Sequence, residues 1–153
     1  MVNYIIVGGA GFIGSHIVEK LIKQKKKVVV IDNLSTGRIE NIKHLLKKIK
    51  FIKSDISKRG KWEKVIKKNS ILIHLAALAD IVPSIEEPEQ YFKSNVIGTF
   101  NLLQACKSKK ILKFIYAASS SCYGIPKKYP TPENAKINSQ YPYALTKKIG
   151  EDL

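Results

Sequence analysis

Short, continuously apolar runs of strand length alternate along the chain with longer segments in which apolar residues recur at helical spacing. Runs that are apolar throughout are typical of strands covered on both faces. Their alternation with helical segments predicts βαβ units and a parallel sheet. The predicted strands are Tyr4–Val7, Val28–Ile31, Phe51–Ile52, Ile71–Leu75 and Leu112–Ala117.

Helical periodicity follows each of these strands, and the last predicted helix begins near Tyr143. The long fourth helix carries a stripe of large side chains, and such a stripe is expected to face the core. The earlier helices are predicted at Phe12–Gln24, Arg38–Lys48, Trp62–Lys68 and roughly Pro88–Lys107. The stripe consists of Tyr91, Phe92, Val96, Phe100, Leu103 and Cys106.

We expect a single α/β domain over residues 1–153, folded as a doubly wound parallel sheet, because no linker, composition break or internal repeat divides the chain. The helix near Tyr143 continues to Leu153 without a C-cap glycine or a following strand. Sheets of this type commonly have about six strands, whereas the sequence predicts the five named above. The pattern therefore predicts a fold truncated after its fifth strand and the start of this helix, the N-terminal portion of a longer protein.

Composition narrows the class of protein. A hydrophobic fraction of 44% with 25% charged residues argues against a disordered chain. The formal net charge is +15, but only Arg38 and Arg59 are arginine, the side chain that base-reading proteins favour. We interpret the charge as a solvated lysine-rich surface rather than a nucleic-acid interface, and a polyanion-binding role is the alternative.

Cysteine usage and hydropathy bear on the compartment. Cys106 and Cys122 form no C-x-x-C pair, which predicts neither a disulfide framework nor a metal site and favours a reducing, cytoplasmic setting. No apolar run approaches the roughly 18 residues of a membrane helix. The apolar N-terminus lacks a basic leader and leads into glycines, so we expect a buried strand there rather than a signal peptide.

A glycine-rich turn, GGAGFIG, begins at Gly8 directly after the first predicted strand. It matches G-x-x-G-x-x-G through Gly8, Gly11 and Gly14, and G-x-G-x-x-G when Gly9 takes the first place. Such turns let the backbone approach a pyrophosphate, and the helix that opens at Phe12 would offer free N–H groups to it. Glycines also form ordinary turns, but the strand before and the helix after supply the context of a dinucleotide-binding site.

An acid follows at the expected distance, because Asp32 ends the second strand eighteen residues after Gly14. A carboxylate there accepts hydrogen bonds from the adenosine ribose and repels a 2′-phosphate, which favours NAD over NADP. The alternative is an Asp32-Asn33 turn of the kind common at strand ends. The presence of Arg38 keeps NADP as an alternative cofactor.

Tyr143 and Lys147 lie four residues apart, on one face of the last predicted helix. A nearby ammonium favours the ionised phenol, which would suit Tyr143 to act as a general base near neutral pH. Spacing alone decides nothing in so lysine-rich a chain, since Tyr123 and Lys127 repeat it. A glycine and Pro126 between that second pair argue against a helix there.

A run of hydroxyls, Ser119–Ser121, follows the fifth predicted strand. Ligands of parallel sheets bind beyond the carboxyl ends of the strands, so we expect these hydroxyls near the crevice of the glycine turn. There a serine could bond a reacting oxygen beside Tyr143. The alternative is a set of small polar residues that close a strand.

Taken in order, these motifs resemble the extended short-chain dehydrogenase/reductase superfamily. Within it they are similar to the NAD-dependent epimerase/dehydratase family, and most to nucleotide-sugar epimerases of the UDP-glucose 4-epimerase type. The resemblance covers essentially the whole chain. Its members are Gly8–Gly14, Asp32-Asn33, Asp55-Ile56, His74–Ala77, Asn95, Ser119–Ser121 and Tyr143-x-x-x-Lys147.

The resemblance implies a bound NAD within a Rossmann-type fold. By that resemblance Gly8, Gly11 and Gly14 hold the pyrophosphate, and His74 is structural. Asn95 would hold the region after the fourth strand from the long helix. The implied cofactor-binding residues are Gly8, Gly11, Phe12, Ile13, Gly14, Asp32, Asn33, Asp55, Ile56, Leu75, Ala76, Ala77, Asn95, Tyr143 and Lys147.

The resemblance also implies a reaction. Tyr143, assisted by Ser119, would take the proton of a sugar 4-hydroxyl while NAD accepts hydride, and the 4-keto sugar would be reduced again on its other face. Lys147 would bond the nicotinamide ribose. The position of Ser119, five residues before Gly124, fits the family's catalytic hydroxyl, with Ser120 and Ser121 as close competitors.

Two departures bear on the subfamily. Related dehydratases carry an Asp-Glu pair where Ser120 and Ser121 stand, which argues against 4,6-dehydration. Some epimerases have a lysine soon after the fourth-strand motif, where this chain has Leu78–Asp80. The alternatives are a UDP-glucuronate decarboxylase and a non-catalytic dinucleotide- or polyanion-binding module. The implied partners are a UDP-sugar and, in the full-length protein, a second copy; the substrate domain would lie outside this chain.

Overall fold

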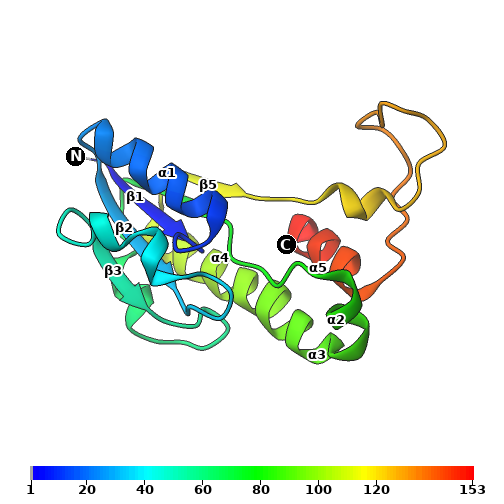
Figure 1. Cartoon of the computed structure of the whole chain (residues 1–153), viewed down its shortest axis with the longest axis horizontal. Helices are drawn as coiled ribbons and strands as arrows, with labels where there is room; N and C mark the ends of the chain where they lie inside the picture. The colour runs from blue at the N-terminus through cyan, green and yellow to red at the C-terminus, as the bar shows by residue number, and fades with distance from the viewer. Residues whose placement is uncertain (1) are drawn as a thin grey trace.

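The computed structural model describes residues 2–153 and contains one sheet of five parallel strands in the order β3-β2-β1-β4-β5. The chain starts in the middle of the sheet, builds outward to β3, then crosses over β1 to β4 and β5 (Figure 1). This confirms the doubly wound α/β sheet. The strands are β1 Asn3–Val7, β2 Lys27–Asp32, β3 Lys50–Lys53, β4 Ser70–His74 and β5 Lys113–Tyr116.

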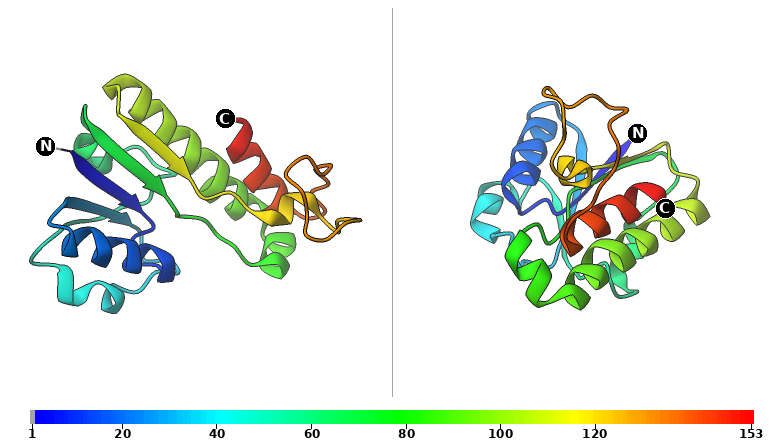
Figure 2. Two further views of the ribbon diagram at one scale, coloured as in Figure 1. Left: turned by 90° about the horizontal axis from the view of Figure 1, so that it is seen from above. Right: turned by 90° about the vertical axis from the view of Figure 1, so that its right-hand side faces the viewer.

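Helices cover both faces of the sheet (Figure 2). The α-helices are α1 Phe12–Lys23, α2 Ile81–Glu86, α3 Pro88–Tyr91, α4 Gly98–Lys109 and α5 Pro142–Asp152. A π-helical segment, η4 Phe92–Ile97, joins α3 to α4. The 3₁₀ turns are η1 Ile39–Asn41, η2 Lys43–Leu45, η3 Lys61–Val65 and η5 Ser120–Tyr123.

Alternating side chains of the strands build a separate core on each face. Ile6 and Val30 pack with Val18 of α1 on one face. On the other face, Ile5 packs with Leu102 of α4 in a cluster that also contains Trp62. Since both faces are covered, the continuous apolar runs that predicted the strands have their physical explanation.

Two predicted α-helices, Arg38–Lys48 and Trp62–Lys68, are wrong: the chain forms only short 3₁₀ turns there. Each turn region buries a pair of apolar residues three positions apart, Ile42 with Leu45 and Trp62 with Val65. A spacing of three aligns side chains on a 3₁₀ turn, so one such pair is buried without a full amphipathic helix. Helix α2 was not predicted.

The predicted core stripe of the long helix is only partly correct. Tyr91, Val96 and Cys106 are buried, but Phe92 is 47% and Phe100 41% exposed. The π-helical turn breaks the 3.6-residue period that the prediction assumed. Small and polar side chains take the inner face of α4 instead: Gly98, Thr99 and Asn101 are buried.

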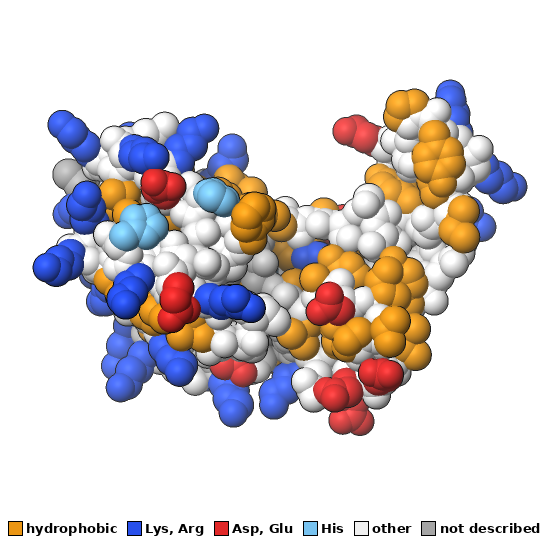
Figure 3. Space-filling model, in the orientation of Figure 1, with side chains coloured by type: hydrophobic (Ala, Val, Ile, Leu, Met, Phe, Trp, Pro, Cys, Tyr) orange, Lys and Arg blue, Asp and Glu red, His pale blue; other side chains and the backbone are white. Residues whose placement is uncertain are grey.

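The charged side chains are unevenly distributed over the surface. Lysines cover the end of the molecule that holds the sheet, whereas acidic side chains gather at the end formed by α2 and α3 (Figure 3). The acidic residues there are Glu86, Glu87 and Glu89. No helix within residues 2–153 is both long and apolar enough to cross a bilayer. The same residues contain no cluster of three potential metal ligands.

Candidate functional site

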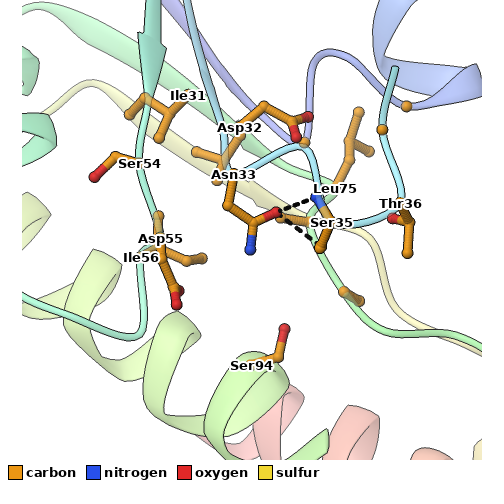
Figure 4. Close-up of a pocket in the computed structure, with 16 residues that line it drawn as sticks. Ile31, Asp32, Asn33, Ser35, Thr36, Ser54, Asp55, Ile56, Leu75 and Ser94 are labelled. Atoms are coloured by element: carbon orange, nitrogen blue, oxygen red, sulfur yellow. Dashed lines mark hydrogen bonds between the residues drawn. The ribbon is translucent and has the colours of Figure 1, made fainter. Parts of the chain in front are cut away.

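A pocket opens at the carboxyl ends of β1, β2, β3 and β4, where the order of the sheet reverses (Figure 4). This edge is where open α/β sheets bind ligands. The sequence-predicted residues that line the pocket are Gly8, Gly11, Asp32, Asn33, Asp55, Ile56, Leu75, Ala76 and Ala77.

The glycines of the turn are needed for different reasons. Gly8 has a φ of +80°, and a Cβ there would lie 2.6 Å from the backbone nitrogen of Ala76. A Cβ on Gly14 would lie 2.2 Å from the carbonyl oxygen of Gly8, so Gly14 lets α1 pack against the turn. On Gly11 a Cβ would meet only one atom, the Gly8 oxygen at 3.3 Å, and it lines the pocket. The missing side chain of Gly11 thus leaves room for a ligand rather than for the protein.

The N-terminus of α1 is free to receive an anion. Gly11 is its N-cap, and no side chain caps the first turn, which also contains no acid. The first N–H groups of a helix have no intrahelical acceptor and lie at the positive end of its dipole. Phe12 and Ile13 point into solvent, with exposed fractions of 79% and 63%, so they offer backbone rather than side-chain contacts.

Asp32 has a structural role as well as a place in the pocket. One carboxylate oxygen accepts from the Ala10 N–H (2.9 Å) and the other from the Leu34 N–H (2.8 Å). A Cβ on Gly37 would approach this carboxylate within 3.0 Å. Because a carboxylate oxygen can accept more than one hydrogen bond, Asp32 retains capacity for a ligand hydroxyl. The turn and ribose interpretations of this residue are therefore compatible.

Asn33 and Asp55 face the pocket from neighbouring loops, with Ser94 of η4 opposite them (Figure 4). The Asn33 side-chain oxygen accepts from both the backbone and the hydroxyl of Ser35, which leaves its amide group free to donate. Asp55 accepts from the Ser57 N–H at 2.8 Å, so its carboxylate is likewise fixed by its own loop.

Other polar residues of the pocket were missed by the sequence analysis. Ser35 and Thr36 lie two and three residues after Asn33, and their small polar side chains beyond the carboxyl edge of β2 were the available signal. Ser94 carried no such signal, because only the path of η4 brings it to the pocket. The missed polar residues are Ser35, Thr36, Ser54 and Ser94; Val7, Ile31 and Gly37 also line the pocket and were not predicted.

Asn95 lies behind the pocket as a buried clamp. Its side-chain oxygen accepts from the Leu78 N–H (2.9 Å), and its amide donates to the Leu78 oxygen (3.0 Å) and to the Thr146 hydroxyl oxygen (3.0 Å). Thr146 in turn donates to the backbone oxygen of Tyr143. Asn95 therefore joins the loop after β4 to helix α5.

His74 supports the same region from the end of β4. Thr99 donates its hydroxyl proton to the backbone oxygen of Asn95. The His74 Nε2–H, at 2.9 Å from the Thr99 hydroxyl oxygen, is therefore the donor of that pair. Burial, aided by the charge of Lys147, lowers the pKa of His74 to about 3. The ring is therefore neutral and structural at physiological pH.

Helix α5 carries Tyr143 and Lys147 on one face, as predicted. Tyr143 is half-buried, whereas Lys147 is 4% exposed and its ammonium lies 4.1 Å from the ring centroid of Tyr116. Burial lowers the pKa of Lys147 to about 8, with Cys122 and Glu151 acting in the opposite direction. Lysine 147 thus titrates far closer to neutrality than an exposed lysine.

The serine run forms the start of η5. Ser119 caps it by accepting from the Ser121 N–H at 3.2 Å, and Ser120 is exposed. The Cys122 thiol donates to the Ala144 oxygen at 3.5 Å, which holds this turn against α5 beside Tyr143. The competing Tyr123–Lys127 pair is excluded, because Lys127 lies in irregular chain.

The predicted site residues thus fall into two groups. The first group lines the pocket. The second group lies outside its walls, at the start of α1, in η4, at the start of η5 and on α5. Residues 75–78 connect them, since Leu75 lines the pocket and Leu78 is held by the clamp of Asn95. The predicted residues that do not line the pocket are Phe12, Ile13, Gly14, Asn95, Ser119, Tyr143 and Lys147.

The glycine turn, the helix terminus and the acid after β2 are the parts of a dinucleotide-binding α/β protein. A family model described as GDP-mannose 4,6 dehydratase matches residues 5–153. The chain therefore belongs to this family of NAD-dependent epimerases and dehydratases.

Individual relatives are sugar-nucleotide epimerases. A putative UDP-glucose 4-epimerase of Methanocaldococcus jannaschii is 40% identical over 97% of this chain and 48% of its own length. The UDP-N-acetylglucosamine 4-epimerase of Methanobrevibacter ruminantium M1, solved with UDP-N-acetylmuramic acid, is 39% identical with a TM-score of 0.91, over 97% of this chain and 48% of its own. The UDP-glucose 4-epimerase of Brucella ovis, solved with NAD, is 36% identical with a TM-score of 0.90, over 99% and 46%. The chain spans about half the length of the curated relatives it matches.

Proposed function

We propose that residues 1–153 form the NAD-binding portion of a nucleotide-sugar 4-epimerase, acting on UDP-glucose or UDP-N-acetylglucosamine. The part that grips the sugar nucleotide would lie outside this chain. One observation carries the proposal: the Asn95 clamp ties the wall of the dinucleotide pocket to the helix of Tyr143 and Lys147. Cofactor binding and proton transfer would thereby share one rigid frame.

The pocket fits a dinucleotide. Gly11 leaves its side-chain space empty at the uncapped start of α1, which suits a pyrophosphate. Asp32 would accept from the adenosine ribose and disfavour a 2′-phosphate, so we expect NAD over NADP. Asp55 and Ile56 would flank the adenine, and residues 75–77 would line the remainder of the cofactor. When bound, NAD supplies the hydride acceptor, which the second half of the cycle regenerates.

The chain's own residues would handle the proton. Tyr143 would remove it from the sugar 4-hydroxyl and return it when the 4-keto sugar is reduced, with Ser119 donating a hydrogen bond to the same oxygen. Lys147 would donate to the nicotinamide ribose. Its buried ammonium, close to half-charged near pH 8, would be sensitive to pH in the range where the enzyme works.

The serines after β5 support epimerisation over dehydration. Ser120 and Ser121 stand where related dehydratases carry an acid pair, and a hydroxyl does not replace a carboxyl in the elimination of water. Although the family model is named after a dehydratase, we therefore propose epimerisation, not dehydration, as the reaction.

The function is tested by incubating the full-length polypeptide that carries residues 1–153 with UDP-glucose, UDP-N-acetylglucosamine and UDP-glucuronate. We expect conversion of the first two sugars to their 4-epimers by NMR, without release of carbon dioxide from the third. Release of carbon dioxide would identify a decarboxylase instead. Tyr143→Phe should abolish turnover while NAD binding persists. If the wild-type protein binds neither NAD nor NADP, the proposal fails.

A second copy of the chain is the partner that we propose for an exposed apolar groove between η4 and α5. Phe92 and Leu145 line it at 47% and 52% exposure, together with Ile149. The groove runs between the segment formed by α3 and η4 and the helix α5, so a two-fold axis there would bring identical apolar faces together.

A further inference from the structure

Lys147 is buried without a carboxylate partner. Its side chain comes from the middle of α5 and is 4% exposed. None of the ion pairs found among residues 2–153 includes it; they join Lys23 to Glu19, Arg59 to Glu63 and Lys148 to Asp152. A buried ammonium is costly unless another group compensates its charge.

The aromatic ring of Tyr116 provides that compensation. The Lys147 nitrogen lies 4.1 Å from the ring centroid, well within the roughly 6 Å over which a ring face attracts a cation. The Tyr116 hydroxyl also donates to the backbone oxygen of Lys147, at 3.4 Å. One residue at the end of β5 thus holds both the side chain and the backbone of Lys147.

Helix α5 has a notch that receives this ring. A Cβ on Gly150 would lie 2.2 Å from the Tyr116 hydroxyl oxygen and 2.7 Å from the adjacent ring carbon. Gly150 follows Lys147 by three residues, so the notch lies on the same side of the helix. From β4, the His74 ring packs against Tyr116 at a centroid distance of 5.6 Å. Only a glycine at position 150 lets the ring lie this close to α5.

We propose that Tyr116 is a positioning residue for Lys147, whose ammonium it holds in place, and in its charged state, through the face of its ring. The role rests on the proposed function only in that Lys147 serves the reaction. Three other titratable groups act on Lys147: His74 of β4, Cys122 of η5 and Glu151 of α5 itself. None of them forms an ion pair with it.

Ring electrostatics can be changed without changing ring shape. Phenylalanine and its mono-, di- and trifluorinated forms are placed at position 116 by site-specific incorporation, since fluorine progressively weakens the attraction of the ring face for a cation. The charged form of Lys147 then loses support, so its pKa should fall by about 0.5 to 1 unit across the series. Every member of the series lacks the Tyr116 hydroxyl, which donates to the Lys147 oxygen. The comparison is therefore made within the series, where the ring is kept and its electrostatics change.

The pKa of Lys147 is followed by NMR of protein labelled with ¹³C and ¹⁵N in lysine, and its signal is identified by its loss in Lys147→Arg. The matched control is the same series at Phe114, which lies two residues earlier on β5 and also contacts the His74 ring. Fluorination at Phe114 should leave the pKa of Lys147 unchanged.

The proposal is overturned if the pKa of Lys147 stays constant across the Tyr116 series, or if fluorination at Phe114 shifts it equally. The titration requires neither cofactor nor sugar. A pKa that shifts in a protein without epimerase activity would contradict the proposed function and leave the role of Tyr116 intact. Full epimerase activity together with a Lys147 pKa that stays unchanged across the Tyr116 series would support the proposed function and contradict the role of Tyr116.

Discussion

At the scale of single residues, the glycine turn separates the needs of the fold from the needs of a ligand. Gly14 is surrounded by backbone atoms, whereas Gly11 faces the pocket. The two glycines occupy equivalent places in the sequence motif, so only their surroundings distinguish them. An alanine at position 11 should therefore mainly weaken ligand binding, whereas an alanine at position 14 should mainly destabilise the fold.

Gly11→Ala should lower the affinity for NAD more than tenfold and change the free energy of unfolding by about 1 kcal/mol or less. Gly14→Ala should destabilise the protein by about 2 kcal/mol or more, because its Cβ would lie 2.2 Å from the Gly8 oxygen. Calorimetric titration and urea unfolding measure the two effects. An unfolded Gly11→Ala protein would contradict the assignment of that glycine to a ligand.

His74 predicts a dependence of stability on pH. Its pKa is lowered in the fold from 6.5 to about 3, so between these values the unfolded chain binds a proton that the folded chain does not. This contribution to stability is therefore complete above pH 6.5 and is lost as the pH falls toward 3, with a slope of at most about 1.4 kcal/mol per pH unit.

Urea unfolding of wild type and His74→Gln from pH 6.5 to 4 tests this prediction, with His16→Gln at an exposed histidine as the matched control. The His74 variant should show a shallower loss of stability on acidification. Parallel curves for wild type and the His74 variant would mean that this ring is not held neutral by the fold.

At the scale of elements, the hydrogen bonds of Asn95 connect helix α5 to the loop after β4. Asn95 bonds Leu78, which lies 17 residues before it in the chain, and Thr146, which lies 51 residues after it. Neither spacing is visible in a sequence pattern. The Asn95 contacts therefore make the mutual placement of the two groups of site residues testable.

Asn95→Ala should destabilise the protein by about 3 kcal/mol, because it leaves the backbone groups of Leu78 without their partners. Hydrogen exchange should accelerate at the Leu78 amide and along α5. Asn101→Ala is the control, since the Asn101 amide donates to the Ile56 and Ser57 backbone oxygens rather than to α5. Equal protection of α5 in the two variants would show that the clamp does not hold this helix.

Element boundaries show how far local patterns extend. The five strands and α1 agree with the sequence prediction, because a buried parallel strand leaves an unbroken apolar run and a glycine turn marks the helix start. The helices predicted at Arg38–Lys48 and Trp62–Lys68 do not form. In each of these segments two apolar side chains are buried by a short 3₁₀ turn. The spacing of apolar residues in the sequence does not distinguish such a turn from an amphipathic helix.

At the scale of the whole molecule, the apolar groove between η4 and α5 predicts self-association. Leu145→Lys would place a charge in the proposed contact between two copies, and we expect it to produce a monomer by light scattering after gel filtration. Leu112→Lys is the matched control, because Leu112 is 56% exposed and lies outside the groove. A Leu145→Lys protein that keeps the mass of the wild type would contradict the proposed dimer.

The net charge of +15 takes on a clearer meaning in the structure. Lysines are spread over the end of the molecule that holds the sheet, while a cluster of acidic side chains lies near α2 and α3 (Figure 3). A lysine surface of this kind repels other cationic chains and attracts anionic nucleotides weakly at long range. The pocket itself is lined by glycines, hydroxyl and apolar side chains, Asn33 and two aspartates, Asp32 and Asp55, and its lining contains no lysine.

The sequence by itself determined the order of the strands along the chain, the glycine turn, the acid after β2 and the helix face of Tyr143 and Lys147. Each of these depends on residues close together in the chain, where sterics and periodicity act directly. Only the tertiary structure decided that Asp32 also braces its own loop and that Tyr116 lies beneath Lys147, 31 residues away. The burial of a side chain and the identity of its contact partners depend on which distant segments pack together, and those contacts form only in the folded sheet.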